Sequence, residues 1–447
     1  MRKLLALPSA TLCFLLLGGC GGCSSGGHSS ADSAAGAIDG GDDSGNGTDA
    51  ASDSSPADAG SPGESGVAAG WLPVSTGGIC TLNTADANGL DTFSPFAWAS
   101  CGPGCRVADA VPPGFVLTSQ RQSSGEYRNG DTFLRLLHSR TASVGGSALS
   151  RIVRLSDGKT VAALDIPTGG CYVPAGGTAA AWFVPLLDAT SSKFMGGSIS
   201  DAASPLTFSD WLPVVGLVKG AFQLQSSFGL ALASGAVLAT APGSPSSWTT
   251  LAVEQAPPEH PLGRGGLLLW IEPGTGGSRS LREYAADAGS QTLVGGAASV
   301  MVATLSDDKV VWITGFGPQA YQHIYTSAEF DWAAIPTAGT PIAPTKGPSL
   351  PYARNLDDLQ SSGDYAATIG CAADAITCEV AVVRISTGAL TSLRPRPGKS
   401  FNRILAMSPS EMVLSEADSP ATSGEVQLVR RLMRIDLTQL AELALSW

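Results

Sequence analysis

Short apolar segments, each built around one large side chain, recur along most of this 447-residue sequence. The central residues of these segments are Trp98, Phe133, Trp182, Phe228, Trp270, Trp312, Tyr365 and Met412. Their mean spacing is about 45 residues, a length typical of repeat units made of several short strands. One such unit cannot bury its apolar face alone, so we expect the units to pack against one another and share their cores.

Weaker repeats lie between the apolar segments and have the composition of β-hairpins. Residues 155–161 (LSDGKTV) resemble residues 305–311 (LSDDKVV), and residues 164–169 resemble residues 385–388 and, more loosely, 435–438. Asp-Gly and Thr-Gly pairs between β-branched runs indicate tight turns between antiparallel strands. Helical periodicity is confined to residues 438–447, and that segment is alternatively a last strand.

Short strands in units of this length predict an all-β chain folded as a β-propeller. The segments at 382–393 (VVRISTGALTSL) and 306–314 (SDDKVVWIT) resemble blade strands of bacterial propellers. We predict seven blades, with six or eight as alternatives, because propellers often complete one blade with strands from both chain ends. Tandem β-sandwiches are the main alternative architecture.

The N-terminus has the features of an export signal. Arg2 and Lys3 precede an apolar run that stops at Gly18, which is too short to cross a bilayer as a helix. Leu17-Gly18-Gly19-Cys20 resembles the lipobox of bacterial lipoproteins, in which the cysteine is lipidated and becomes the first residue of the mature chain. The resemblance implies a signal peptide over 1–19 and a membrane anchor at Cys20. Gly21, in place of the aspartate that retains enteric lipoproteins in the inner membrane, favours the outer membrane, on its periplasmic face or at the cell surface.

Residues 20–70 are rich in Gly, Ser, Ala and Asp and contain eight acidic residues but no Lys or Arg. Such a segment buries too little apolar surface to offset its ordering entropy, so we predict a disordered acidic tether. Its aspartates lack the spacing of a calcium-binding loop. The folded ectodomain is expected over 71–447.

The net charge of −12 and the absence of a basic stripe argue against nucleic acid as a partner. The basic residues Arg394, Arg396, Lys399 and Arg403 are interpreted as a solvated turn.

Six cysteines fall within the predicted ectodomain, as expected of disulfides in an oxidising compartment. Cys371 and Cys378 flank a hairpin tip and are predicted to pair. Cys101 and Cys105 either pair with each other, or one of them reaches Cys80. If two of these three pair, the third is left for Cys171. No metal site or cofactor is predicted, because the three histidines of the ectodomain are isolated.

Catalytic motifs are not evident. Ser-x-x-Lys occurs at Ser156/Lys159 and Ser306/Lys309, but in hairpin turns and without the partners that serine enzymes need. Residues 257–264, with Glu259, His260 and Arg264, are interpreted as an exposed loop.

The sequence therefore leaves two functions open. The first is a non-catalytic binding or scaffold module for an envelope protein or glycan. The alternative is a glycan-acting lyase or hydrolase that collects carboxylates from several blades. Fold by itself does not decide between them.

Overall fold

The computed structural model of the chain describes residues 71–75 and 81–85, and then 95–443 with gaps, the longest being 140–147, 173–181, 317–326 and 419–427. All described residues belong to the second of the two units into which the chain divides, Pro62–Trp447. The predicted signal peptide, Cys20, the predicted tether and Cys80 lie outside the described residues.

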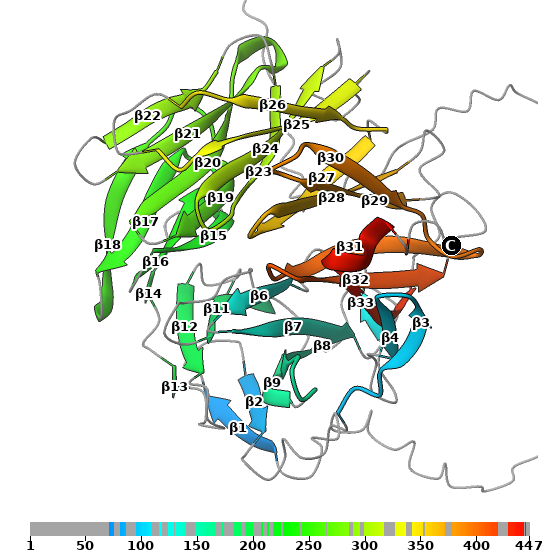
Figure 1. Cartoon of the computed structure of the whole chain (residues 1–447). Coiled ribbons are helices and arrows are strands. Elements are labelled where there is room, and N and C mark those ends of the chain that lie inside the picture. Colours follow the sequence, from blue (N-terminus) through cyan, green and yellow to red (C-terminus); the bar gives the residue numbers. More distant parts are fainter. Residues whose placement is uncertain are drawn as a thin grey trace, which may run out of the picture. The chain divides into compact units, whose positions relative to one another are not determined.

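The described strands form five hydrogen-bonded sheets. Because the largest two sheets each contain two four-stranded antiparallel groups, we divide the strands into seven groups, numbered here as blades 1 to 7 in chain order (Figure 1). Blade 1 consists of β6 (Ser124–Arg128), β7 (Asp131–Ser139), β8 (Ala148–Arg154) and β9 (Thr160–Ile166). Blade 2 consists of β10 (Cys171–Tyr172), β11 (Trp182–Asp188), β12 (Lys193–Ile199) and β13 (Thr207–Phe208), with β14 (Leu212–Pro213) also on β12. Blade 3 consists of β15 (Val218–Leu224), β16 (Ser227–Leu232), β17 (Ala236–Ala241) and β18 (Ser244–Val253).

The same four-stranded pattern continues through the second half of the chain. Blade 4 consists of β19 (Glu259–Arg264), β20 (Leu267–Pro273), β21 (Arg279–Ala285) and β22 (Gly289–Val294). Blade 5 consists of β23 (Ser299–Leu305), β24 (Lys309–Phe316), β25 (Ser327–Ala334) and β26 (Thr345–Ser349). Blade 6 consists of β27 (Arg354–Ser362), β28 (Tyr365–Cys371), β29 (Cys378–Arg384) and β30 (Ala389–Leu393).

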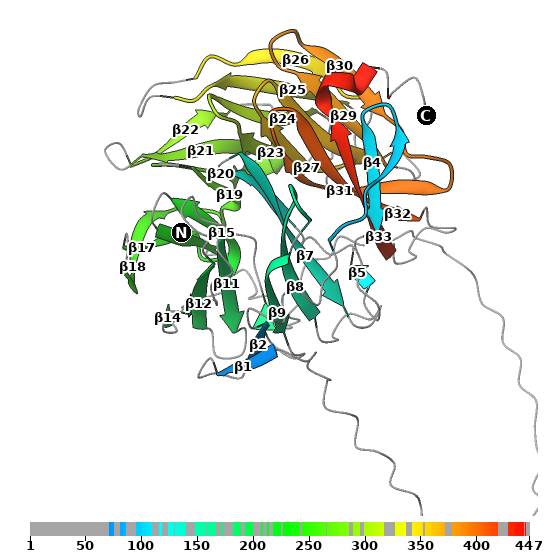
Figure 2. The same ribbon diagram turned by 60° about the horizontal axis from the view of Figure 1, so that its bottom comes forward.

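Blade 7 combines strands from both ends of the described chain. Its first three strands are β31 (Lys399–Met407), β32 (Glu411–Asp418) and β33 (Leu428–Asp436), and its fourth is β4 (Cys105–Asp109). Figure 2 shows β4 lying alongside β33. β3 (Ala99–Gly102) forms a hairpin with β4, and β5 (Val116–Thr118) pairs with both β7 and β33. β1 (Trp71–Ser75) and β2 (Thr81–Ala85) extend blade 1 beyond β9.

The first strands of neighbouring blades lie next to one another, in the series β15, β19, β23, β27, β31 and β6. Strands near this inner row are buried on both faces, as in β23 and β24, whereas the last strands β22 and β26 are partly exposed. Burial on both faces is expected where sheets pack against sheets on either side, and it explains the continuous apolar runs of the inner strands. The predicted all-β propeller is therefore confirmed.

The repeat of large side chains marks the second strand of each blade. Phe133, Trp182, Phe228, Trp270, Trp312, Tyr365 and Met412 lie in β7, β11, β16, β20, β24, β28 and β32. Trp270 packs with Phe222 of blade 3, and Trp312 packs with Leu269 of blade 4. Met412 likewise packs towards the preceding blade, whereas Tyr365 of blade 6 packs on the cluster that blades 6 and 7 share. Large residues at this position thus fill the space between neighbouring blades.

Other sequence repeats proved misleading. Trp98 lies in an irregular segment before β3, and is not in a strand. Residues 155–158 form the turn between the third and fourth strands of blade 1, whereas residues 305–309 join the first and second strands of blade 5. The equivalent of 155–158 is the turn after β29, at 385–388. Turn sequences of similar composition serve different connections because the local hydrogen bonding of a tight turn is the same in each.

The segment after β33 begins with a 3-10 turn, η4 (Leu437–Gln439), and continues as helical residues Leu440 and Ala441. Asp436 accepts a hydrogen bond from the Thr438 backbone N–H (2.9 Å), so its side chain closes the start of this turn. Leu437, Leu440 and Leu443 are buried against blades 6 and 7. The predicted terminal helix is therefore a short helical segment held in place by apolar packing. No described helix is long and apolar enough to cross a membrane.

Candidate functional site

A cavity of about 850 Å³ lies where the turns of blades 1 and 7 meet. We call it the turn cavity. Its walls are the β3–β4 hairpin, the β6–β7 and β8–β9 turns, the β31–β32 turn and the end of β33. Its charged and aromatic lining residues are Arg106, Tyr127, Asp131, Glu411, Arg434 and Asp436. These five segments, from both ends of the described chain, meet here because blade 7 is completed by β4.

Arg434 and Glu411 form a bidentate ion pair at the wall of the turn cavity. The Arg434 guanidinium donates from Nε to Glu411 Oε1 (2.6 Å) and from Nη2 to Oε2 (2.9 Å). The same guanidinium lies 5.2 Å from the centre of the Trp98 ring, a cation–π geometry. A planar guanidinium held by a bidentate carboxylate and an aromatic face has little freedom to move.

Asp131 accepts hydrogen bonds from its neighbour Thr132 in β7 and from Ser156 in the β8–β9 turn. The backbone N–H groups of Thr132 (2.7 Å) and Ser156 (3.2 Å) donate to its Oδ1, and the Ser156 hydroxyl donates to its Oδ2. Both oxygens of the Asp131 carboxylate thus accept hydrogen bonds, and the Ser156 hydroxyl is not free to act as a nucleophile.

Blade 6 has the same arrangement. The Ser386 backbone N–H (2.7 Å) and hydroxyl (2.5 Å) donate to Asp364, which also pairs with Arg384 (3.0 Å). Partial burial acts to raise the pKa of Asp364, but the hydrogen bonds from Ser386 and Arg384 outweigh it and hold the pKa below its ordinary value. In both blades a serine directly after the third strand, Ser156 in blade 1 and Ser386 in blade 6, therefore donates to an aspartate at the turn between the first and second strands. We call this contact an Asp–Ser link.

Asp436 is also occupied, because Thr438 and Gln439 (3.0 Å) donate to it. Its backbone N–H donates to the Gly104 carbonyl (2.8 Å). Gly104 has a φ of +61°, and a Cβ there would lie 2.8 Å from Gln439 Cβ. A glycine is thus required for the β3–β4 hairpin to approach the end of β33.

Two lining side chains are left without such partners. Arg106 is exposed and has no ion-pair or hydrogen-bond partner among the described residues, although it lies directly opposite Arg434 in the β33–β4 register. Tyr127 is 39% exposed, one of two large apolar side chains in the described part of the chain that are exposed. Both groups are available to a ligand, as is the exposed hydroxyl group of Ser410.

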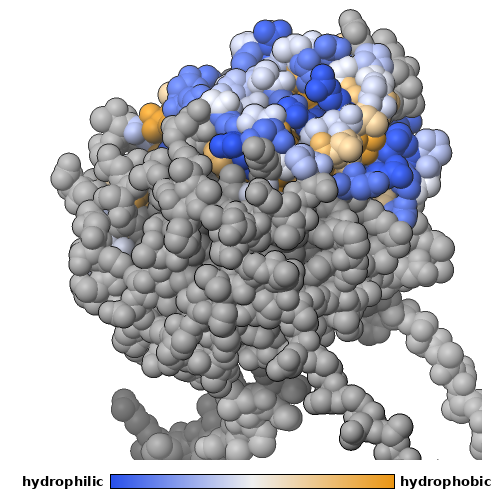
Figure 3. Space-filling model, turned by 90° about the horizontal axis from the view of Figure 1, so that it is seen from below, coloured by the Kyte–Doolittle hydropathy of each residue, from blue (hydrophilic) through white to orange (hydrophobic). Residues whose placement is uncertain are grey.

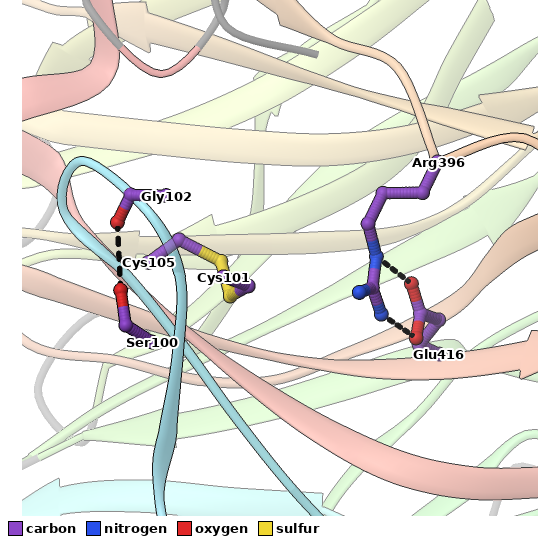
Figure 4. Close-up of a disulfide and its surroundings, with 6 residues drawn as sticks. All are labelled: Ser100, Cys101, Gly102, Cys105, Arg396 and Glu416. Atoms are coloured by element: carbon purple, nitrogen blue, oxygen red, sulfur yellow. Dashed lines mark hydrogen bonds and ion pairs between the residues drawn. A yellow bond between two sulfur atoms is a disulfide. The ribbon is translucent and has the colours of Figure 1, made fainter.

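Two disulfides are present among the described residues. Cys101 pairs with Cys105 across the β3–β4 hairpin (Figure 4), and Cys371 pairs with Cys378 between β28 and β29. Of the alternatives left open by the sequence, the Cys101–Cys105 pairing is the one adopted, so neither residue reaches Cys80. Cys171 lies in β10.

The segment at 259–264, interpreted above as a loop, is strand β19, the first strand of blade 4. Glu259 pairs with the buried Arg279, and Arg264 pairs with Asp307 (2.5 Å). His260 has a φ of +48°, at an irregularity in the pairing with β20. The loop assignment was wrong because Pro257, Pro258 and Pro261 resemble a connection, whereas an inner strand with a bulge tolerates proline.

The four basic residues at 394–403 are not simply solvated, because each pairs with a carboxylate. Arg394 contacts Glu379 (3.3 Å), Arg403 contacts Asp358 (3.5 Å), and Lys399 contacts Asp418. Arg396 makes a bidentate pair with the buried Glu416 (Figure 4). Ser306 is buried at 1% exposure, and the Lys309 ammonium binds Asp308 (2.7 Å), so this Ser-x-x-Lys pair also holds no exposed nucleophile.

The ion-pair network of blade 4 was not expected from the sequence. Arg282 contacts Glu254 (3.3 Å) and Glu272 (3.4 Å), and Ser290 donates to Glu254 (2.6 Å). Burial raises the pKa of Glu272, while Arg282 opposes this and Glu254 adds to it. The adjacent charges Arg282 and Glu283 inside a strand were the available signal. In the described residues no group of three or more His, Cys, Asp or Glu side chains is placed to hold a metal ion.

Asp331, in β25, is a buried acid that should make stability depend on pH. Its Oδ2 accepts from Thr314, but its Oδ1 has no partner among the described residues. Burial is the main cause that raises the pKa of Asp331, so folding favours the protonated form. Its contribution to stability is complete below the unfolded pKa of about 3.9 and is lost as the pH rises through the folded value.

We therefore expect Asp331→Asn to remove this penalty. Urea unfolding at pH 4 and pH 7 should show that wild-type stability falls more steeply between these values than that of the variant. An equal or steeper fall in the variant would contradict the assignment. Thr304→Val, which changes a buried hydroxyl of the same blade without a charge, is the control and should leave the pH dependence unchanged.

The pairing of strands places this chain among the β-propeller proteins. No protein-family model and no curated protein matches it. Among solved structures, the chain is similar to an oligogalacturonate lyase from Vibrio parahaemolyticus, with 10% identity over 77% of this chain and 98% of that chain and a TM-score of 0.49. It is also similar to the β-propeller domain of Cps50 (Swd1) from Myceliophteria thermophila, with 13% identity over 73% and 100% and a TM-score of 0.47. A chain of the mitotic checkpoint complex has 13% identity over 77% and 98%, with a TM-score of 0.45.

Proposed function

We propose that this chain is a membrane-anchored lipoprotein whose propeller binds a ligand without transforming it. One observation carries the binding role: the three carboxylates of the turn cavity are all held by donors of the chain itself, while Arg106 and Tyr127 face the cavity unengaged. A general acid or base has to exchange a proton with its substrate, and a carboxylate bound on both oxygens is poorly placed to do so. Carboxylates held in this way, together with the unpaired guanidinium of Arg106 and the ring of Tyr127, suit binding of a ligand rather than proton transfer.

The location follows from the N-terminal sequence. Lipid chains at Cys20 would attach the protein permanently, because each buried methylene contributes about 0.8 kcal/mol and two or more chains anchor stably. A tether of about 50 residues would let the propeller reach roughly 40 Å from the outer membrane. An envelope protein or a glycan would lie within this reach, and we propose one of these as the ligand.

The alternative, a glycan-acting lyase or hydrolase, needs a pair of carboxylates free to act on substrate. Glu254 and Glu272 are neighbours, but Arg282 bridges them, and the Glu254 side chain is only 6% exposed. The described carboxylates therefore favour binding.

Changing Cys20 to alanine tests the anchor. We expect Cys20→Ala to move essentially all of the protein from the membrane pellet to the soluble fraction, because the lipid attachment atom is lost. Cys23→Ala is the matched control and should remain in the pellet after washing with high salt. Tight membrane association of Cys20→Ala, or release of Cys23→Ala alone, would contradict the proposal.

A further inference from the structure

We infer that the turn cavity binds a neutral saccharide, with one sugar ring against Tyr127 and hydroxyl groups bound by Arg106 and the lining carboxylates. This inference rests on the proposed binding function and names the ligand class. It is carried by the charge of the lining, by the free donors and acceptors within it, by the exposed ring of Tyr127 and by the rigid hairpin that holds Arg106.

The charge of the lining disfavours a charged ligand of either sign. The lining carries three carboxylates against two guanidinium groups, a net charge of −1, from Asp131, Glu411, Asp436, Arg106 and Arg434. An anion would meet this surplus of negative charge, which hydrogen bonds to the carboxylates do not remove. A cation would meet the guanidinium of Arg106, which has no carboxylate partner among the described residues. A neutral ligand meets neither repulsion.

The same lining offers strong hydrogen-bond donors and acceptors together. A carboxylate has about four lone-pair positions, of which Glu411 uses two for Arg434 and Asp131 uses three for donors of blade 1. Arg106 keeps its guanidinium donors, because no acceptor among the described residues binds them. A hydroxyl group both donates and accepts, so neighbouring hydroxyl groups of one sugar can use a carboxylate and a guanidinium at once. A ligand with hydroxyl groups on most of its carbons therefore matches this lining.

The hairpin that presents Arg106 is fixed before a ligand arrives. Cys105, the preceding residue, is buried and linked to Cys101, and the Asp436 backbone N–H donates to the Gly104 carbonyl (2.8 Å). A side chain on a preformed hairpin loses less entropy on binding than one on a mobile loop. This saving matters for a neutral sugar, because its hydroxyl groups form weaker hydrogen bonds than charged groups do.

Tyr127 supplies a flat surface for a sugar ring. It lies near the end of β6, lines the cavity and is 39% exposed. The face of an aromatic ring is partly negative and attracts the partly positive C–H groups on one side of a sugar ring. Ser100 and Ser410 add exposed hydroxyl groups to the same cavity. A volume of about 850 Å³ falls in the range of sites for small molecules and short oligomers.

A neutral peptide is the main rival, and the lining disfavours it. Peptide sites gain specificity from pockets for apolar side chains. The described lining residues are mostly polar or glycine, and Leu155 and Cys105 are buried. The described part of the face in Figure 3 is likewise mostly hydrophilic, with apolar residues in small groups. The chemistry of the cavity therefore favours a saccharide.

Calorimetry tests the inference on the full-length chain, purified in a detergent without a sugar head group. The probes are the neutral trisaccharides of glucose, galactose, mannose and N-acetylglucosamine, with trigalacturonate and triglucosamine as charged counterparts and N-acetylated triserine amide as the peptide rival. We expect at least one neutral trisaccharide to bind, and the charged counterparts and the peptide to bind at least about fivefold more weakly. Affinity for the neutral sugar should change by less than about twofold between about 50 mM and about 500 mM salt, because screening acts on charges.

Three variants place the sugar in the cavity. Arg106→Ala should weaken binding of the neutral sugar by at least about tenfold, because a charged donor is lost. Tyr127→Ala should weaken it by at least about fivefold, whereas Tyr127→Phe keeps the ring and should stay within about threefold of the unchanged chain. Arg394→Ala is the matched control, because Arg394 is 80% exposed next to blade 6 and its loss should leave affinity unchanged. Thermal unfolding of each variant separates a lost contact from a lost fold.

Three results would overturn the inference: no binding of any neutral trisaccharide, tighter binding of a charged counterpart or of the peptide, or unchanged affinity of either Arg106→Ala or Tyr127→Ala. Chromatography of the bound sugar after prolonged incubation is a separate readout. An intact trisaccharide agrees with the proposed binding function, whereas its cleavage would contradict that function and leave the ligand class in place. Membrane partition of the Cys20 variants is also measured separately, so failure here leaves the anchoring proposal standing.

Discussion

Replacing Phe330 with alanine should lower the free energy of unfolding by about 3–5 kcal/mol, the range for removal of a large side chain from a packed core. Phe330 lies in β25 and is fully buried. It belongs to the apolar cluster between blades 5 and 6, together with Val311, Ala366 and Val383. The cavity left behind would be shared by two blades, and neither can close it without moving away from its other neighbour. Because domains are stable by only about 5–15 kcal/mol, this is a large fraction of the total.

Urea unfolding followed by tryptophan fluorescence gives the measurement. Val253→Ala is the control, since Val253 is 72% exposed and its truncation should change stability by less than about 0.5 kcal/mol. A Phe330→Ala variant as stable as this control would show that the two blades do not share a core at this position.

Glu416→Ala should be the next most damaging change, with an expected loss of about 2–4 kcal/mol. The Glu416 side chain is 1% exposed and receives both Nε (3.2 Å) and Nη2 (2.5 Å) of Arg396. Removing the carboxylate leaves a guanidinium with much of its surface buried and no counter-charge. Arg396 is 28% exposed and can partly turn to solvent, which keeps the expected loss below that of a fully enclosed pair.

A double-mutant cycle with Arg396→Ala isolates the interaction. The double variant should be less destabilised than the sum of the single variants, by about 1–3 kcal/mol. The neighbouring pair of Arg394 and Glu379 is the control, because Arg394 is 80% exposed and surface pairs couple by about 1 kcal/mol or less. Equal coupling in the two pairs would mean that burial does not strengthen the Glu416 pair.

The spacing of large residues predicted the class of fold because the same packing problem recurs in each blade. Trp270 and Trp312 fill the gap to the preceding blade from the second strand, and the sequence repeats that solution. Trp98 has the same local composition and also packs on an apolar cluster, that of blades 1 and 7, but it lies outside any strand and its ring contacts Arg434. Composition alone does not distinguish an aromatic in a strand from one in an irregular segment.

The turn cavity was beyond prediction from the sequence. Arg106 is about 300 residues distant in sequence from Glu411 and Arg434, and nothing in its surroundings differs from an exposed strand end. The Asp–Ser links were equally hidden, because Asp131 and Ser156 look like ordinary turn residues until the two turns are brought together. The short-range disulfides, by contrast, were within reach, since Cys371 and Cys378 flank a single hairpin.

The sequence by itself determined the strand units, their period and the turns within them, because these depend on side-chain alternation and on hydrogen bonds between neighbouring residues. Only the tertiary structure decided which strands from opposite ends of the chain complete blade 7. Backbone hydrogen bonds are alike for every strand, so β4 carries no local mark that selects β33 as its partner. That pairing brings Arg106 beside Arg434 and creates the turn cavity.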